Sequence, residues 1–331
     1  MSKHKKIAVF GGGSWATAIV KMLVENEEKV GWYMRSSYAV EHIKINNNNP
    51  NYLSSVEFDT DKLDLSCDMN KIVDNYDYLI FAIPSAFLKS ELDKFNPNLE
   101  GKIIFSAIKG IVPEAGTIVG EYFHNIYKIP YDNIGVVTGP CHAEEVALER
   151  LSYLTIACQN EKHAEIVANK IACNYIRTKI SDDIYGTEYS AVLKNIFAIA
   201  AGVAHGLGYG DNFQAVVMSN SIREIDRFLK VVYPINRDIK NLAYLGDLLV
   251  TGYSVFSRNR MFGNMIGKGY TVKSAQMEMN MIAEGYYATK SITKLIEKYD
   301  IDMPITEAMY KILYKGKNPK TVMNKLTEKL N

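Results

Sequence analysis

Lys194 is the residue whose type and surroundings point most directly to chemistry. It lies in residues 188–206, EYSAVLKNIFAIAAGVAHG, a segment that predicts a single apolar helix with one cation near its middle. A lone ammonium group is costly to bury, so a lysine in such a helix needs either partners or a chemical role. With about 100° of rotation per residue, Ala191, Ala198 and Ala201 share its face, and these small side chains leave room for another helix or a ligand. The competing interpretation is a core helix whose lysine extends to the surface.

A lysine is suited to proton transfer when its pKa lies close to neutral pH. Burial and a neighbouring cation both lower the pKa of an amine. Lys109, which follows a predicted strand, is a candidate for that cation and for a group that polarises a carbonyl oxygen. Asp247 is the only charged residue in residues 242–251, LAYLGDLLVT, and would either orient Lys194 or bind a substrate hydroxyl. These residues together predict acid–base chemistry on an alcohol or a carbonyl compound.

A glycine-rich turn near the N-terminus predicts a dinucleotide site. Residues 7–10, IAVF, are typical of a buried parallel strand, and GGGSWA follows at once. Residues 17–25 then have helical character, which completes the strand, turn and helix of the dinucleotide fingerprint. Gly11 would make the tight turn, and Gly13 would let the backbone approach a pyrophosphate at the helix N-terminus. An ordinary turn is the alternative interpretation.

Arg35 bears on which dinucleotide binds. It follows the second predicted strand, residues 29–34, and lies about 20 residues beyond the glycines. An acidic residue here would bind the ribose 2′-hydroxyl of NAD, whereas arginine favours the 2′-phosphate of NADP. The expected cofactor is therefore NADP or NAD, with NADPH favoured; a solvated loop arginine is the alternative. The polar run at residues 46–51, NNNNPN, is predicted to be a surface loop.

Three more predicted strands end in candidate ligand groups. The strands are residues 78–83, 103–107 and 134–138, and the groups that follow them are Ser85, Lys109 and Gly139. Ligands of open parallel sheets bind beyond the carboxyl ends of the strands, which would bring these groups to one edge. For Ser85 and Lys109, an ordinary loop residue is the alternative interpretation. Pro140 fits the first position of a helix, so free backbone donors are also expected there.

The alternation of strands and helices stops near residue 182. Residues 153–158 and 175–180 are strand-like, a helical segment lies between them, and no convincing strand follows. We therefore expect an α/β Rossmann-type domain over residues 1–182 and an all-helical domain over residues 183–331. The helix that carries Lys194 would be the first long helix of the second domain.

Two further clusters lie in the helical part. Ser257-Arg258-Asn259-Arg260 can direct several hydrogen-bond donors at one phosphate, and arginine offers a bidentate fork. A basic surface turn is the alternative. Glu284-Gly285 is predicted to end a methionine-rich helix that packs in the core.

Composition excludes several classes of protein. The 331 residues include 38 basic and 37 acidic residues, for a net charge of +1, so bulk charge points to neither a nucleic acid nor a membrane surface. No window reaches the roughly 18 apolar residues of a membrane span, and the first apolar run is too short for a signal peptide. The cysteines form no CxxC pair, so we expect free thiols and no metal site. A cytoplasmic protein that acts on a small molecule fits these facts. A homodimer is compatible with them.

In this order, the clusters resemble the prokaryotic-type NAD(P)-dependent glycerol-3-phosphate dehydrogenase family over essentially the whole chain. The matching pieces are Gly11-Gly12-Gly13-Ser14-Trp15, Ile83-Pro84-Ser85, Lys109-Gly110-Ile111, Gly139-Pro140, Leu193-Lys194-Asn195, Leu245-Gly246-Asp247-Leu248, Ser257-Arg258-Asn259-Arg260 and Ala283-Glu284-Gly285-Tyr286. Each piece is weak alone, whereas all of them in one order are highly specific. The resemblance implies an enzyme that interconverts sn-glycerol 3-phosphate and dihydroxyacetone phosphate and supplies glycerol 3-phosphate for phospholipid synthesis. It also implies a helical domain like the C-terminal domain of 6-phosphogluconate dehydrogenase.

The resemblance implies roles for individual residues as well. Lys194 matches the proton-transferring lysine of the family. The implied cofactor contacts, beside the two glycines of the turn, are Ser14, Trp15, Arg35, Lys109, Ala143, Arg258, Ile282 and Glu284. The implied substrate contacts are Lys109, Gly139, Cys141, Lys194, Asp247, Ser257, Arg258 and Asn259.

Several positions depart from the family's usual pattern without removing a group that the chemistry needs. Ala16 stands where glycine is common, and Cys141-His142 replaces a serine–phenylalanine pair. Tyr244 and Gly252 stand where glycine and cysteine are more usual. Two alternatives remain: another dehydrogenase of this architecture, acting on a 3-hydroxy acid or ketopantoate, and a dinucleotide sensor without catalysis.

Overall fold

The chain divides into two compact units. The computed structural model describes residues 5–279 and 283–330. One unit, the sheet unit, comprises Met1–Ile108 and Val119–Ile184, and the other, the helical unit, comprises Lys109–Ile118 and Tyr185–Asn331. The sequence-based boundary falls between residues 182 and 183, whereas the units change over after Ile184. The short segment Lys109–Ile118 additionally belongs to the helical unit.

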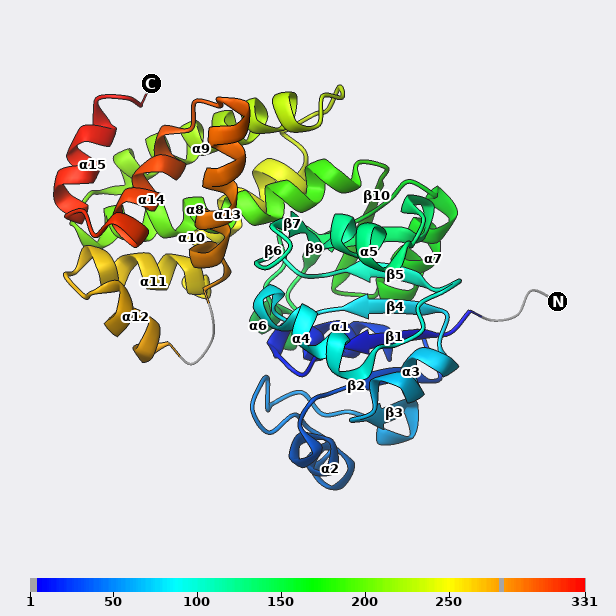
Figure 1. Cartoon of the computed structure of the whole chain (residues 1–331). Helices are drawn as coiled ribbons and strands as arrows, with labels where there is room; N and C mark the ends of the chain where they lie inside the picture. The colour runs from blue at the N-terminus through cyan, green and yellow to red at the C-terminus, as the bar shows by residue number, and fades with distance from the viewer. Residues whose placement is uncertain (1–4, 280–282, 331) are drawn as a thin grey trace. The chain divides into compact units, whose positions relative to one another are not determined.

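The sheet unit is built on an eight-stranded sheet, whose strands lie in the order β10-β9-β8-β5-β4-β1-β2-β3 (Figure 1). Neighbouring strands are parallel except for β8 and β9, which are antiparallel. The strands are β1 Ile7–Phe10, β2 Val30–Tyr33, β3 Leu63–Ser66, β4 Tyr78–Phe81, β5 Ile103–Ser106, β8 Ile134–Thr138, β9 Ser152–Cys158 and β10 Ile176–Ser181. This order confirms the predicted Rossmann-type α/β fold.

The sequence of the central strands explains why they lie inside. Every residue of β1, β2, β4, β5 and β8 is buried, as expected of parallel strands covered on both faces. The helices that accompany these strands are α1 Ser14–Leu23, α2 Ser37–Asn46, α3 Met69–Asn75, α4 Ser85–Phe95, α5 Val119–Tyr127, α6 Ala143–Ala147 and α7 Glu161–Ile171. In the sheet, β2 and β3 follow on one side of β1, whereas β4 and the later strands lie on its other side. The point at which the strand order reverses therefore lies beside β1, where open α/β sheets bind their ligands.

The helical unit contains one short hairpin, β6 Ile111–Val112 with β7 Thr117–Ile118, which the sequence analysis missed because two-residue strands carry no periodicity. Its helices are α8 Ile184–Gly206, α9 Asp211–Val232, α10 Asp247–Tyr253, α11 Arg258–Gly267, α12 Val272–Glu278, α13 Glu284–Tyr299, α14 Pro304–Lys315 and α15 Pro319–Thr327. Within the described residues, no strand follows β10, which confirms the expectation of a helical second part.

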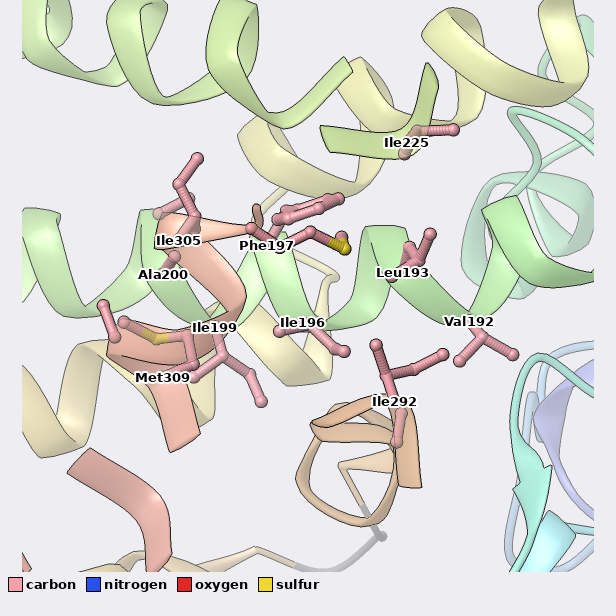
Figure 2. Close-up of a cluster of buried hydrophobic side chains, with 14 of the residues drawn as sticks. Val192, Leu193, Ile196, Phe197, Ile199, Ala200, Ile225, Ile292, Ile305 and Met309 are labelled. Carbon is pink, nitrogen blue, oxygen red and sulfur yellow. The ribbon is translucent and has the colours of Figure 1, made fainter. Parts of the chain in front are cut away.

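Helix α8 is the centre of this unit. Val192, Leu193, Ile196 and Phe197 are fully buried in the main apolar cluster, and side chains of α9, α13 and α14 meet them there (Figure 2). Ile225 of α9, Ile292 of α13, and Ile305 and Met309 of α14 are labelled. A helix packed in this way is held rigidly, because every neighbour would lose apolar contacts if it moved.

Glycines bring α11 into backbone contact with α8. A Cβ on Gly202 would lie 2.0 Å from the carbonyl oxygen of Arg260, and one on Gly263 would lie 2.1 Å from that of Ile199. Only glycine fits at distances this short. The N-terminal turn of α11, which carries Arg258 and Asn259, is thereby held at a fixed place beside the central helix.

Two local expectations were wrong. Pro140 does not begin a helix: α6 begins at Ala143, with His142 as its N-cap, and Pro140 lies in the loop before it. Glu284 and Gly285 do not end a helix but begin α13. Gly285 is needed there because a Cβ would lie 2.6 Å from the carbonyl oxygen of Asn195 on α8.

Candidate active site

Lys194 and Asp247 form a buried ion pair in the helical unit. Lys194 is 3% exposed and Asp247 is 1% exposed, and the ammonium Nζ contacts Oδ1 of the carboxylate. The structure therefore excludes the interpretation in which Lys194 extends to the surface. Breaking such a pair is costly, because the remaining charge would stay buried without its partner.

Asp247 is positioned by the start of a helix. It is the first residue of α10, and it follows a π-helical turn over Leu242–Gly246. Its backbone N–H donates to the carbonyl oxygens of Leu242 and Tyr244, and its own carbonyl accepts from Thr251 Oγ1 at 2.6 Å. The positive end of the helix dipole favours a carboxylate at this position.

Lys109 completes a group of three charges. Its Nζ lies 3.7 Å from Oδ2 of Asp247, so one carboxylate bridges two ammonium groups. The amide of Asn195 donates to the carbonyl oxygen of Lys109 at 2.7 Å, which ties the Lys109 backbone to α8. In the sequence, Asn195 is notable only as part of the family motif Leu193-Lys194-Asn195. Asn195 directly follows Lys194 in the sequence. That adjacency is the signal that could have revealed its role in holding the Lys109 backbone.

The environment lowers the pKa of Lys194 to about 7. Burial is the largest cause, because the charged form loses its hydration. The negative charge of Asp247 opposes this effect, and the positive charge of Lys109 adds to it. An amine with this pKa exchanges protons readily near neutral pH, which is what an acid–base group requires.

The turn before α11 is the second polar part of the helical unit. Ser257 is the N-cap of α11, and its Oγ accepts a hydrogen bond from the backbone N–H of Arg260 at 3.3 Å. Asn259 Oδ1 accepts from the backbone N–H of Gly285 at 2.9 Å. Arg258 is partly exposed. Because Gly285 packs on Asn195, contacts run continuously from Asn259 to the residue after Lys194.

The glycine turn of the sheet unit has the features that a dinucleotide requires. Gly11 has a φ of 138°, and a Cβ there would lie 2.7 Å from the carbonyl oxygen of Ala82. Gly13, by contrast, faces open space, with no atom within 4 Å of an added Cβ. Gly13 is also the N-cap of α1, and it has no side chain to occupy the first backbone donors of that helix. These donors and the space beside them fit a pyrophosphate.

The turn is also held rigid, because neighbouring side chains bond all three glycine carbonyls. Trp32 Nε1 donates to the oxygen of Gly11 at 2.7 Å, Asn49 Nδ2 to that of Gly12 at 3.1 Å, and Thr17 Oγ1 to that of Gly13 at 2.9 Å. The expectation that residues 46–51 form only a surface loop was wrong for Asn49, whose side chain is fully buried. Sequence reasoning missed it because an asparagine-rich run resembles a solvated loop.

Arg35 lies just beyond the carboxyl end of β2. Its side chain is 65% exposed, and its guanidinium lies over the ring of Phe87 at 5.6 Å. Its guanidinium lies 4.0 Å from the carboxylate of Glu91. Glu91 itself accepts a 2.6 Å hydrogen bond from Tyr33. The arginine thus retains most of its surface for a ligand.

The structure gives the positions of the remaining predicted site residues. In the sheet unit, Ser14 opens α1 and Trp15 follows it, while Gly139, Cys141 and Ala143 lie in or just after the loop beyond β8. Cys141 and Ala143 are buried. In the helical unit, Glu284 begins α13, and Ile282 lies outside the described residues.

Comparison with known proteins decides the family. Residues 6–164 match the model of the NAD-dependent glycerol-3-phosphate dehydrogenase N-terminus, and residues 183–324 match that of its C-terminus. The chain belongs to this family. Glycerol-3-phosphate dehydrogenase [NAD(P)+] of Listeria innocua is 35% identical over 98% of this chain and 96% of its own. That of Bacillus subtilis is 34% identical over 97% and 94%.

A solved structure gives the same result for the fold. The crystal structure of glycerol-3-phosphate dehydrogenase from Coxiella burnetii matches with a TM-score of 0.90 and 27% identity, over 98% of this chain and 99% of that one. These matches confirm the family that the sequence resembles, and the family implies a nicotinamide dinucleotide as the cofactor. In the part of the chain that the structure describes, no group of side chains is arranged to hold a metal ion. No described helix is long and apolar enough to cross a membrane.

Proposed function

We propose that this protein interconverts sn-glycerol 3-phosphate and dihydroxyacetone phosphate with NAD(P), and that Lys194 is its general acid and base. The observation that carries the proposal is the buried group of Lys194, Asp247 and Lys109, with the pKa of Lys194 at about 7. In a family of dehydrogenases, such a lysine fits the exchange of a proton with the substrate oxygen.

The protein groups account for the proton balance of the reaction. A nicotinamide dinucleotide supplies hydride transfer when it is bound. In oxidation, the neutral amine of Lys194 takes the proton of the C2 hydroxyl as the hydride leaves C2. In reduction, the ammonium of Lys194 gives its proton to the oxygen of the former carbonyl group. Lys109 stabilises negative charge on that oxygen, and Asp247 holds Lys194 in position or bonds a substrate hydroxyl.

The direct test follows loss of NADPH or NADH absorbance upon addition of dihydroxyacetone phosphate. Turnover that depends on this compound supports the enzyme, and ketopantoate or a 3-oxo acid serves as the competing substrate. Turnover of those compounds alone would point to another dehydrogenase of this architecture. Dinucleotide binding without any turnover would point to a sensor.

Arg258 is proposed to bind the substrate phosphate together with Ser257 and Asn259, and also to contact the cofactor. We expect Arg258→Ala to lower kcat/KM for dihydroxyacetone phosphate by about 10- to 100-fold, since a hydrogen bond to a charged group contributes about 1.5–3 kcal/mol. Most of the loss should lie in KM. Arg227→Ala removes a partly exposed arginine of the same unit that pairs with Asp302, and it should leave the kinetics unchanged. Equal KM values for Arg258→Ala and the wild type would exclude the phosphate contact.

Arg35 is proposed to select NADPH over NADH. Arg35→Ala should lower kcat/KM for NADPH by about 10-fold or more and leave that for NADH nearly unchanged, because only NADPH carries the 2′-phosphate. Initial rates with the two cofactors in both proteins give the comparison directly. A wild-type enzyme that strongly prefers NADH would contradict the prediction.

We further propose the functional division of the chain. Residues 1–182 bind the dinucleotide through Gly11, Gly13, Ser14, Trp15 and Ala143, and residues 183–331 carry the catalytic groups. Gly139 and Cys141 add substrate contacts, and Ile282 and Glu284 add cofactor contacts. The enzyme is proposed to act in the cytoplasm, where its product supplies phospholipid synthesis, and to form a homodimer, which sedimentation would test.

A further inference from the structure

Ser190 is a buried hydroxyl that the proposed mechanism does not use. Its residue is 1% exposed, and among the described residues Oγ has no hydrogen-bond partner. An unpaired buried polar group costs about 1–3 kcal/mol. The hydroxyl therefore lowers the stability of the fold unless a partner binds it, and a ligand that is present only during the reaction is such a partner.

Other buried hydroxyls in this unit show what an ordinary helical residue does. Ser221, Thr251, Thr289 and Thr293 each donate to the carbonyl oxygen four residues earlier, at 2.7, 2.6, 2.7 and 2.8 Å. This bond is available to any serine inside a helix. Ser190, in the interior of α8, does not make it, so its hydroxyl is directed elsewhere.

The position of Ser190 places it beside the proposed acid–base group. It lies four residues before Lys194, about 40° away around the helix axis at 100° per residue. Side chains four apart on a helix are neighbours, with Cβ atoms about 5–6 Å apart, and they lean toward the N-terminus. The side chain of Lys194 therefore extends over the turn that carries Ser190.

This face of α8 is distinct from the apolar one. Val192, Leu193, Ile196 and Phe197 belong to the apolar cluster and lie about 60° or more from Lys194 around the axis. Ser190 lies about 40° from Lys194, and the small side chains of Ala198 and Ala201 share that face. Lys194 and Ser190 are both buried, at 3% and 1% exposed, so a substrate that reaches the Lys194 amine also enters the surroundings of the Ser190 side chain.

We propose that Ser190 binds the terminal, unphosphorylated hydroxyl of the substrate and so selects three-carbon phosphates that carry it. The inference rests on the proposed function. The substrate carbon next to the reacting C2 bears this hydroxyl, so a group one helical turn from the Lys194 side chain is suitably placed to meet it. A neutral hydroxyl both donates and accepts, which matches the alcohol of either substrate.

The test compares two substrates in three proteins. Dihydroxyacetone phosphate carries the terminal hydroxyl, and hydroxyacetone phosphate, with a methyl group instead, lacks it. Ser190→Ala should lower kcat/KM for dihydroxyacetone phosphate by about 10-fold, the upper range for one neutral hydrogen bond, and leave that for hydroxyacetone phosphate unchanged. Ser221→Ala, which removes a buried hydroxyl already bonded within α9, should leave the preference at the wild-type value.

Thermal unfolding separates this role from a structural one. Ser190→Ala should match or exceed the wild-type Tm without ligand, because it removes an unpaired hydroxyl. Ser190→Cys, which is close in size and carries only a weak thiol donor, provides a second variant without the hydroxyl if the alanine protein does not fold. An unchanged preference in a folded variant overturns the inference while wild-type turnover upholds the function. A wild type that fails to reduce dihydroxyacetone phosphate overturns both.

Discussion

Lys194→Ala should retain between about a hundredth and a ten-thousandth of wild-type turnover, since general acid–base groups contribute about 10²–10⁴-fold. The loss follows from the geometry, because Lys194 is the buried amine of the site and its pKa of about 7 suits proton transfer in both directions. Dinucleotide affinity should survive, because the glycine turn that fits the pyrophosphate belongs to the sheet unit. Steady-state rates in both directions and fluorescence titration with NADPH measure the two effects.

Lys170 offers a matched control. It is 8% exposed, and its Nζ pairs with Glu27 at 2.6 Å in the sheet unit, so it is a second buried lysine with a carboxylate partner. Lys170→Ala should lower Tm, because it breaks a buried ion pair, and kcat should stay close to wild type. Near-normal turnover in Lys194→Ala would remove Lys194 from the proton transfer and leave the proposed mechanism without its central group.

The sequence alone was sufficient for features that depend on local pattern. Buried strands followed by glycines predicted the Rossmann-type sheet, and the loss of alternation predicted the helical part. A single lysine in an apolar helix and a single aspartate in another apolar stretch indicated that Asp247 either orients Lys194 or binds a substrate hydroxyl, and the structure shows the two side chains paired. That pair is a contact between α8 and α10, and the physical reason for it, the cost of an uncompensated buried charge, can be read in the composition of each segment.

Features that depend on contacts between distant segments could not be predicted in the same way. Gly285 was interpreted as a helix end, because glycine commonly ends helices, whereas its actual constraint is the backbone of Asn195 90 positions away. Asn49 looked solvated because only the folded chain brings it to the glycine turn. The start of α6 at Ala143 instead of Pro140 likewise has no signature in the neighbouring residues.

Asp247→Asn should lower the reduction rate at pH 7 by about 10- to 10³-fold, since an opposite charge in contact shifts a pKa by about 1–3 units. The sign follows from the causes of the Lys194 pKa. Burial and Lys109 lower it, and Asp247 raises it, so loss of the carboxylate charge moves it below about 7. Less of the ammonium form then exists at pH 7, and reduction requires that form.

The pH dependence of kcat/KM tests this reasoning in both directions. In the wild type, reduction should decline as pH rises through about 7, and oxidation should rise over the same range, because the two directions use opposite forms of Lys194. Asp247→Asn should move both transitions to lower pH. Lys109→Met removes the neighbouring cation and should move them to higher pH, in addition to any loss of substrate contact. Shifts of the same sign in the two variants would contradict the electrostatic account. A raised KM without any shift in Asp247→Asn would make Asp247 a ligand of a substrate hydroxyl and not the group that sets the proton affinity of Lys194.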